Sequence, residues 1–238
     1  MTKNHSQPEF PPEYRYPRNL LGRRLLKWTV GSVVRLLSRI KVEGHENLPD
    51  QGPLIVTANH FHFFDALALI LSAPYPLEFL ADFEMPNVPS LFKIFPALYK
   101  VHDVAQGSAN IRAVNASLAI LAQDGVLGIF PEGRVHNQTL KPALPGAAYL
   151  ALRSGAPILP VGIYSTDEWD VVGTLRREKR RVDAVCRFGE VVGPLTCDNP
   201  RRPSRQALID AGDRIMTAIA QQLPVEMRGR FGETGEDA

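Results

Sequence analysis

The segment Asn59–Asp65 combines two histidines with an aspartate, directly after a short apolar run. A histidine can act as a general base when a carboxylate holds its Nδ1–H and leaves Nε2 free to accept a proton. His60 and Asp65 lie five positions apart, about 140° on a regular helix, so they meet only if the chain bends between them. His62 and Asp65, three apart, could meet on one helical turn. The spacing alone therefore does not choose between the two histidines.

The same residues permit two other interpretations. His60-x-His62 resembles half of a metal-ligand set, as found in metallo-hydrolases. Asp65 could also be a helix-start residue that interacts only with the helix dipole. The other four histidines form no convincing second cluster: His5, His45, His102 and His136. A metal site is therefore the weaker functional interpretation, and the structural interpretation of Asp65 stays open.

A second segment, Phe130–Arg134, follows another apolar run. The planar guanidinium of Arg134 can bind two phosphate oxygens at once, and Gly133 permits close approach of a ligand. Open α/β sheets bind ligands beyond the carboxyl ends of their strands, so both segments are placed where a site is expected. Taken alone, the segment could be a plain turn with a surface ion pair. A third segment, 157–161, contains Pro160, which predicts an edge, a bulge or a strand end.

The elements that position these segments alternate along the chain. Apolar runs predict strands at 54–58, 77–81, 98–102, 126–130, 157–163 and 181–189. Helical patterns occupy 64–71, 108–125, 144–153 and the stretch from Ser204 to Leu223. This alternation predicts an α/β fold, a single domain with a mixed, largely parallel sheet flanked by helices. The long connection 164–181 ends in a basic run at 176–181 and is expected to be functional or mobile.

Charge is distributed unevenly along the chain. The formal net charge is only +2, from 27 basic and 25 acidic residues, and it gives no indication of a nucleic-acid partner. Residues 14–41 carry eight of the basic residues and no acid, which leaves 19 basic residues against 25 acidic ones elsewhere. Within this stretch, 18–40 predicts an amphipathic helix with a basic polar side, suited to an anionic membrane surface.

The overall composition limits the class of protein to which the chain can belong. At 45% hydrophobic and 22% charged residues, the chain is expected to be globular rather than disordered. We expect no membrane-spanning helix and no secretory signal, because no apolar stretch is long enough. Two cysteines without CxxC spacing favour a reducing compartment and structural thiols. The predicted organisation is an irregular lead-in (1–17), the basic helix (18–40), a catalytic domain (41–225) and a frayed tail (226–238).

Together the polar segments resemble the PlsC-type phospholipid/glycerol acyltransferases, which include the lysophosphatidic acid acyltransferases. Asn59-His60-x4-Asp65 resembles their NHx4D motif, and Phe130–Arg134 their FPEG motif. Residues 156–161 are similar to their proline-containing fourth motif. The resemblance covers about residues 40–195, and the pair of motifs is specific.

This resemblance implies roles for individual residues. His60 becomes the general base and Asp65 its orienting partner, while Asn59, Glu132, Gly133 and Arg134 bind the acceptor. It implies transfer of a fatty acyl group from acyl-CoA or acyl carrier protein, as co-substrate, to a hydroxyl of a lysophospholipid or glycerol-phosphate-type acceptor. Neither a bound cofactor nor a metal is implied. The protein is expected to be a peripheral protein at the cytoplasmic face of the cell membrane.

One part of the family pattern is missing. The second motif usually contains a glycine and ends in an arginine, whereas residues 95–103 have neither. Lys93, Lys100 or Arg112 could supply the lost charge to a phosphate. The departure also keeps alternatives open: a non-phosphatidate lipid acceptor, a metal-dependent hydrolase, or a lipid-binding relative without turnover.

Overall fold

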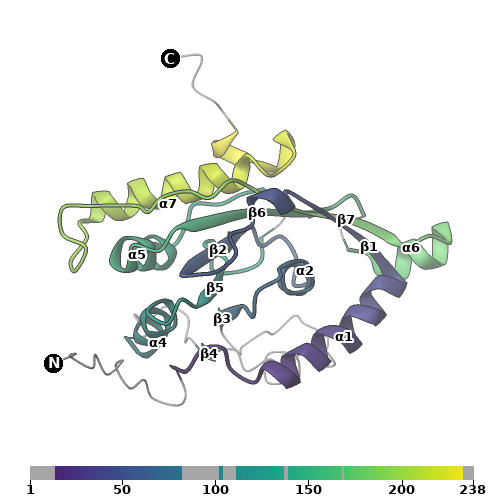
Figure 1. Cartoon of the computed structure of the whole chain (residues 1–238). Helices are drawn as coiled ribbons and strands as arrows, with labels where there is room; N and C mark the ends of the chain where they lie inside the picture. Colours follow the sequence, from purple (N-terminus) through teal and green to yellow (C-terminus); the bar gives the residue numbers. More distant parts are fainter. Residues whose placement is uncertain (1–13, 82–101, 104–110, 137–138, 168, 233–238) are drawn as a thin grey trace.

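The alternating apolar and amphipathic segments form one mixed β-sheet covered by helices in the computed structural model of the chain (Figure 1). The structure describes residues 14–81, 102–103, 111–136, 139–167 and 169–232. Over these residues the sheet has seven strands in the order β1-β7-β6-β2-β5-β3-β4, and only the β6–β7 pair is antiparallel. The predicted α/β class with a mixed, largely parallel sheet is confirmed.

The strands are β1 (Ser38–Glu43), β2 (Leu54–Ala58), β3 (Glu78–Ala81), β4 (His102–Asp103), β5 (Val126–Ile129), β6 (Ile158–Ser165) and β7 (Val182–Phe188). The α-helices are α1 (Leu20–Leu37), α2 (Phe64–Ser72), α4 (Ile111–Leu121), α5 (Pro145–Ser154), α6 (Val171–Glu178) and α7 (Arg205–Ala220). Three 3-10 turns complete the described chain: η2 (His45–Asn47), η3 (Val225–Met227) and η4 (Gly229–Phe231).

The sheet separates two apolar clusters. Strand β2 is buried along its whole length. Successive residues of a strand face opposite sides of the sheet, so both of its faces are covered. Leu54 and Val56 pack in the cluster that includes α2, whereas Ile55 packs in the cluster that includes α4, α5 and α7. Figure 1 shows α5 and α7 together on one side of the sheet and α2 on the other. This double cover makes β2, β5 and β6 a rigid support for the loops that follow them.

The carboxyl ends of β2 and β5 lie side by side at one end of the sheet, next to the middle of β6. Strand β2 pairs in parallel with β5 and with β6, with Thr57 opposite both Ile129 and Pro160. The chain segments that follow β2 and β5, 59–63 and 130–136, therefore leave the sheet next to one another. Strand β6 continues past the end of β2 to Ser165 along the same edge.

Pro160 lies inside β6, a strand with neighbours on both sides, and not at an edge. Its carbonyl accepts a hydrogen bond from the N–H of Gly189, which follows the last residue of β7. The ladder to β7 begins one residue later, at Val161 opposite Phe188. Proline has no backbone N–H to donate. At position 160 this costs no β6–β7 ladder bond, because β7 has already ended there. Contrary to the prediction from the sequence, the proline is thus at neither an edge nor a strand end within β6, but opposite the end of the neighbouring strand β7.

The predicted helix 18–40 is shorter in the structure. Helix α1 ends at Leu37, and residues 38–43 form β1, which pairs in parallel with β7. The sequence Arg-Ile-Lys-Val-Glu at 39–43 alternates with a period of two, and its β-branched residues Ile40 and Val42 face the core. The open edge of β7 gives this alternating stretch a partner, so the strand forms in place of the last helical turn.

Helix α1 buries basic residues and exposes apolar ones. Arg23 is 4% exposed and forms an ion pair with the fully buried Glu78 of β3, at 2.6 Å. Arg18, just before the helix, pairs with the same carboxylate, and Lys27 Nζ donates to the carbonyl of Ala73 at 2.6 Å. The opposite side of the helix exposes large apolar side chains: Leu21 (82%), Leu25 (63%), Trp28 (68%), Val33 (57%) and Leu36 (73%). The predicted basic outer side is thus partly turned inward.

The two ends of the described chain are attached to the domain. Gln123 of the α4–β5 connection binds the backbone of Tyr14 and Tyr16, inside the predicted irregular lead-in. Residues 226–232, predicted to fray, include η4 and part of η3, and Met227 and Phe231 pack against the core. No described helix combines the length and apolarity that crossing a membrane requires.

Candidate active site

The segment after β2 is held to the neighbouring strand by Asn59. Its side chain is fully buried; Nδ2 donates to the carbonyl of Ile163 and Oδ1 accepts from the N–H of Ile163, both at 2.7 Å. The amide thereby replaces one rung of the β2–β6 ladder after the strand itself has ended. The chain then bends away from the sheet and enters α2 at Phe64.

His60 and Asp65 face one another across this bend. His60 Nδ1 lies 3.5 Å from Asp65 Oδ2, longer than a well-formed hydrogen bond, and Asp65 is fully buried. The His60 side chain is 17% exposed, while Nδ1 itself is buried. Its ring stacks on Phe130, with 4.2 Å between centroids and an angle of 19°. The ring is thus fixed with Nδ1 towards the carboxylate, while the side chain as a whole stays partly exposed.

His62 has a different environment. Its backbone N–H donates to Asp65 Oδ2 at 2.7 Å, and its Nδ1 accepts the N–H of Phe64 at 3.3 Å. Burial, with a smaller contribution from His60, lowers the pKa of His62 below its ordinary value. The aromatic rings of Phe63 and Phe64 lie against it. His62 therefore supports the turn that carries Asp65, and His60 is the histidine whose ring faces the carboxylate.

The Phe130–Arg134 segment forms a tight turn beside His60. Glu132 is 3% exposed; Oε1 accepts the N–H of His60 at 2.9 Å and Oε2 accepts the N–H of Lys141 at 3.0 Å. Burial raises the pKa of Glu132, partly offset by these two backbone hydrogen bonds. Gly133 has φ +74°, and a Cβ there would collide with the side chain of Leu144. The turn itself thus requires glycine, a reason that the sequence alone did not give.

The basic residues predicted near the site are differently placed. Arg134 is exposed, and no hydrogen bond or ion pair holds its guanidinium among the described residues. Arg112 lies exposed in the first turn of α4. Lys93 and Lys100 lie outside the described residues. Arg134 is therefore the predicted cation that the structure places in the same turn as Glu132, close to the backbone of His60.

A metal-binding arrangement is not found in the part of the chain that the structure describes, where no three His, Cys, Asp or Glu side chains could together hold an ion. Four buried side-chain atoms of the described residues lack a hydrogen-bond partner, and two of them, His60 Nδ1 and Asp65 Oδ1, belong to the His–Asp pair. The other two are Thr57 Oγ1 and Ser72 Oγ. Unpaired buried polar groups cost free energy and gather at functional sites.

Comparison with known families bears directly on this geometry. A family model described as Acyltransferase matches residues 39–164, more than half of the chain. The chain belongs to the acyltransferase family. The matched residues run from β1 to β6 and include both polar segments of the site, as the resemblance to PlsC-type enzymes implied.

Individual relatives of this acyltransferase carry a more specific name. A 1-acyl-sn-glycerol-3-phosphate acyltransferase of Borreliella burgdorferi is 29% identical over 134 residues, which cover 55% of this chain and 53% of that protein. The alpha form of the same enzyme from Ovis aries is 23% identical over 216 residues, 89% of this chain and 74% of that protein. The matched part thus spans about half of the bacterial relative's length.

A solved structure confirms the fold of the acyltransferase. The crystal structure of the 1-acyl-sn-glycerophosphate (LPA) acyltransferase PlsC from Thermotoga maritima matches with a TM-score of 0.57 at 20% identity. The match covers 84% of this chain and 78% of that chain. At this identity the likeness concerns the fold alone.

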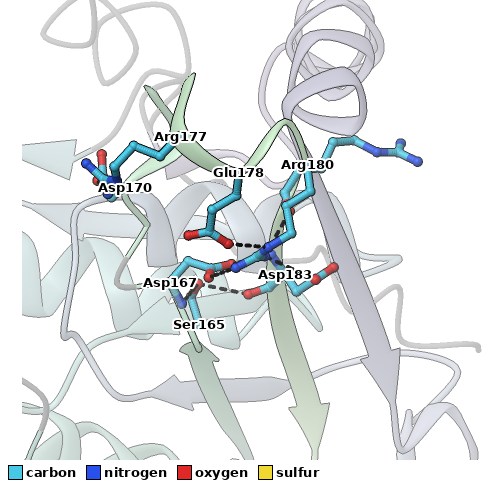
Figure 2. A network of polar contacts seen from close by, with 8 residues as sticks. Ser165, Asp167, Asp170, Arg177, Glu178, Arg180 and Asp183 are labelled. Carbon is cyan, nitrogen blue, oxygen red and sulfur yellow. Dashed lines mark hydrogen bonds and ion pairs between the residues drawn. The ribbon is translucent and has the colours of Figure 1, made fainter. Parts of the chain in front are cut away.

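The sequence missed a helix near the site of this acyltransferase. The long connection after β6 contains α6, which Asp170 caps by accepting the N–H of Gly173. Figure 2 shows the polar network at its base, where Asp167 accepts two hydrogen bonds from Arg180, at 2.6 and 2.9 Å, and one from the N–H of Asp183. The Arg180 hydrogen bonds lower the pKa of Asp167. Only three of the eight residues of α6 are apolar and Gly173 lies among them, so the apolar pattern was too short to predict a helix.

Trp169 is a further residue that sequence reasoning missed. It is 7% exposed and lies against Phe64, the first residue of α2, with 5.6 Å between ring centroids. The connection between β6 and β7 therefore packs against the start of the helix that carries Asp65. The sequence signal that could have indicated this contact is a large aromatic residue in an otherwise polar connection.

Proposed function

We propose that this acyltransferase moves a fatty acyl group from an acyl thioester, on coenzyme A or acyl carrier protein, to the free hydroxyl of a lysophosphatidate-type acceptor. The observation that carries the proposal is the His60–Asp65 pair, at 3.5 Å, beside the exposed Arg134 at one edge of the sheet. The names of the bacterial and sheep relatives agree with this acceptor.

In the proposed reaction His60 is the general base. It takes the proton from the acceptor hydroxyl, and that oxygen forms a bond to the thioester carbonyl carbon. The carbon–sulfur bond then breaks, and the leaving thiolate takes the proton from His60, so the products are an ester and a free thiol. Asp65 fixes the ring and stabilises the imidazolium that forms between these steps. The stack on Phe130 holds the ring against rotation.

The acceptor phosphate is proposed to bind Arg134. Its planar guanidinium offers a fork of donors that fits two phosphate oxygens, and its exposure leaves that fork open. The positive φ of Gly133 turns the chain so that Arg134 follows directly on the turn beside His60. Arg112 of α4 is a second candidate for the phosphate, and Lys93 and Lys100 remain candidates from the sequence.

The test is release of free thiol by the purified protein, with a panel of lysolipids and long-chain acyl-CoA or acyl carrier protein as donors. We expect turnover with lysophosphatidic acid and its loss, with the fold intact, in His60→Ala. A general base contributes about 10²- to 10⁴-fold to the rate. Full activity of His60→Ala would remove the assigned base, and no thiol release with any pair would contradict the reaction.

We also propose that α1 docks the enzyme on an anionic membrane surface, where such an acceptor is found. Five large apolar side chains of α1 are more than half exposed, which is unusual for a helix facing water only. Residues 14–41 contain no acid, so nothing in this segment repels an anionic leaflet. Peripheral binding at the cytoplasmic face of the cell membrane is the corresponding location.

A further inference from the structure

The two peptide groups of His60 are both held by the segment after β5. Its N–H donates to Glu132 Oε1 at 2.9 Å, and its carbonyl accepts the N–H of His136 at 2.9 Å. One residue earlier, Asn59 binds both backbone atoms of Ile163 in β6. The backbone of His60 is thereby fixed by hydrogen bonds to both neighbouring strand systems.

The side chains that make these bonds have little capacity for a substrate. Asn59 is 0% exposed, and its donor and acceptor atoms each already have a partner. Glu132 is 3% exposed, and each carboxylate oxygen accepts one backbone N–H. A carboxylate oxygen has further lone pairs, but an acceptor molecule cannot reach them in a buried side chain. In the same turn, Gly133 and Arg134 are exposed.

We propose that Asn59 and Glu132 are positioning residues: they fix the backbone of His60 so that its ring faces Asp65, and they do not contact the acceptor. This replaces the substrate-binding role that the family resemblance implied for them, and it rests on the proposed function of His60 as the base. Small errors in the placement of a reacting group are costly, since about 1 Å can change a rate 100-fold.

The chemistry of Glu132 explains why a carboxylate is needed there. Two backbone N–H groups, from different segments, point at one side chain, and both need an acceptor. A carboxylate offers two acceptor oxygens, whereas the amide of glutamine would place an N–H₂ group against one of the two N–H donors. Glu132→Gln therefore breaks one of the two connections with almost no change in side-chain volume.

The experiment combines kinetics with hydrogen exchange. We measure thiol release for Glu132→Gln and Arg134→Ala with lysophosphatidic acid and long-chain acyl-CoA. The exchange rates of the His60 and Lys141 amides are measured by NMR. For Glu132→Gln we expect kcat to fall about 10- to 100-fold with the acceptor KM within about threefold. One of the two amides that Glu132 holds, that of His60 or that of Lys141, should exchange at least about tenfold faster, because the glutamine NH₂ group faces it and its acceptor is lost. For Arg134→Ala we expect the acceptor KM to rise and the His60 amide to stay protected.

The opposite pattern would overturn the proposal. A raised acceptor KM in Glu132→Gln, with kcat and the exchange of both the His60 and Lys141 amides unchanged, would make Glu132 a substrate ligand. If Glu132→Gln does not fold, Glu132→Asp keeps the charge and both oxygens but shortens the side chain by one methylene. It should show the same faster exchange and lower kcat, and normal values of both would contradict a positioning role.

The two proposals fail in different ways. If His60→Ala kept full activity, the general-base function would be wrong, yet the exchange rate of the His60 amide would still report whether Glu132 holds it. If Glu132→Gln changed neither the exchange nor kcat, only the positioning role would be wrong. Asn59→Asp provides an independent variant, because its second oxygen would face the carbonyl of Ile163 and weaken the same anchor.

Discussion

The active-site loops and helix α1 depart from the usual distribution of side chains in opposite directions. In the loops after β2 and β5 and the first turn of α2, polar and charged side chains are buried: Asn59, Asp65 and Glu132 are all below 4% exposed. On α1, apolar side chains are exposed, with Leu21 at 82% and Leu36 at 73%.

The two regions differ in where their side chains find partners. The buried Asn59 and Glu132 find their partners inside the protein, in the backbone of neighbouring segments. The exposed leucines of α1 have no such partner in the described part of the chain, so their burial requires another surface. One region is thus completed by the fold, and the other is proposed to be completed by a membrane.

The first prediction tests the loops through Asp65. Asp65→Asn should lower kcat about 100-fold or more, because the ring of His60 loses the carboxylate that orients it and stabilises its charged form. Steady-state thiol release measures the effect. Asp210→Asn, at an exposed position of α7, is the matched control and should keep normal activity. Equal activities would show that the buried carboxylate has no part in the reaction.

The second prediction concerns the buried ion pair between α1 and the sheet. Glu78→Ala should lower the free energy of unfolding by about 3–5 kcal/mol, since Arg23 would keep a buried charge without its carboxylate. Urea denaturation measures the loss. Glu43→Ala removes a more exposed carboxylate that pairs with Lys41 and Arg187, and it should cost at most about 1 kcal/mol. Similar losses in both variants would contradict a special role for the buried pair.

The third prediction tests the exposed face of α1. Leu25→Glu and Leu36→Glu should each weaken binding to vesicles with anionic lipid about tenfold, because a side chain that would be buried in lipid is lost. Co-sedimentation measures binding, and thermal unfolding should stay unchanged because both positions are exposed. Ile209→Glu, at a 44% exposed position of α7, is the control. The same loss for all three variants would mean that α1 is not the docking surface.

The fourth and smallest effect is expected from α6. The chain just after this helix lies next to the end of α1, since Arg181 Nη1 donates to the carbonyl of Arg35 at 2.9 Å. Lys179→Gln should weaken vesicle binding about fivefold at low salt, corresponding to ~1 kcal/mol for one basic residue. The effect should disappear at high salt, where charges are screened. Arg205→Gln, exposed at the start of α7, should bind normally, and an equal loss there would indicate general charge attraction only.

Local patterns in the sequence determined most of the architecture. Continuous apolar runs such as 54–58 are typical of buried strands, and Ser204 indeed caps α7 by accepting the N–H of Ala207. The types of His60, Asp65 and Arg134 indicated acid–base and phosphate-binding chemistry, but their spacing left both histidines open, and the resemblance to PlsC-type enzymes assigned the base to His60. The family match agrees with the acyltransferase class that this resemblance implied.

Tertiary structure decided what depends on distant partners. Residues 38–43 form a strand only because β7 offers an edge, and α1 turns Arg23 inward only because Glu78 lies beneath it. Glu132 is sealed by two N–H groups that are 72 and 9 positions away in the chain. Sequence periodicity reports which side chains share a face, but it contains no information on the group that a given face meets. The sequence therefore determined most of the elements and the candidate reacting residues, whereas the tertiary structure decided which polar side chains hold the proposed site together.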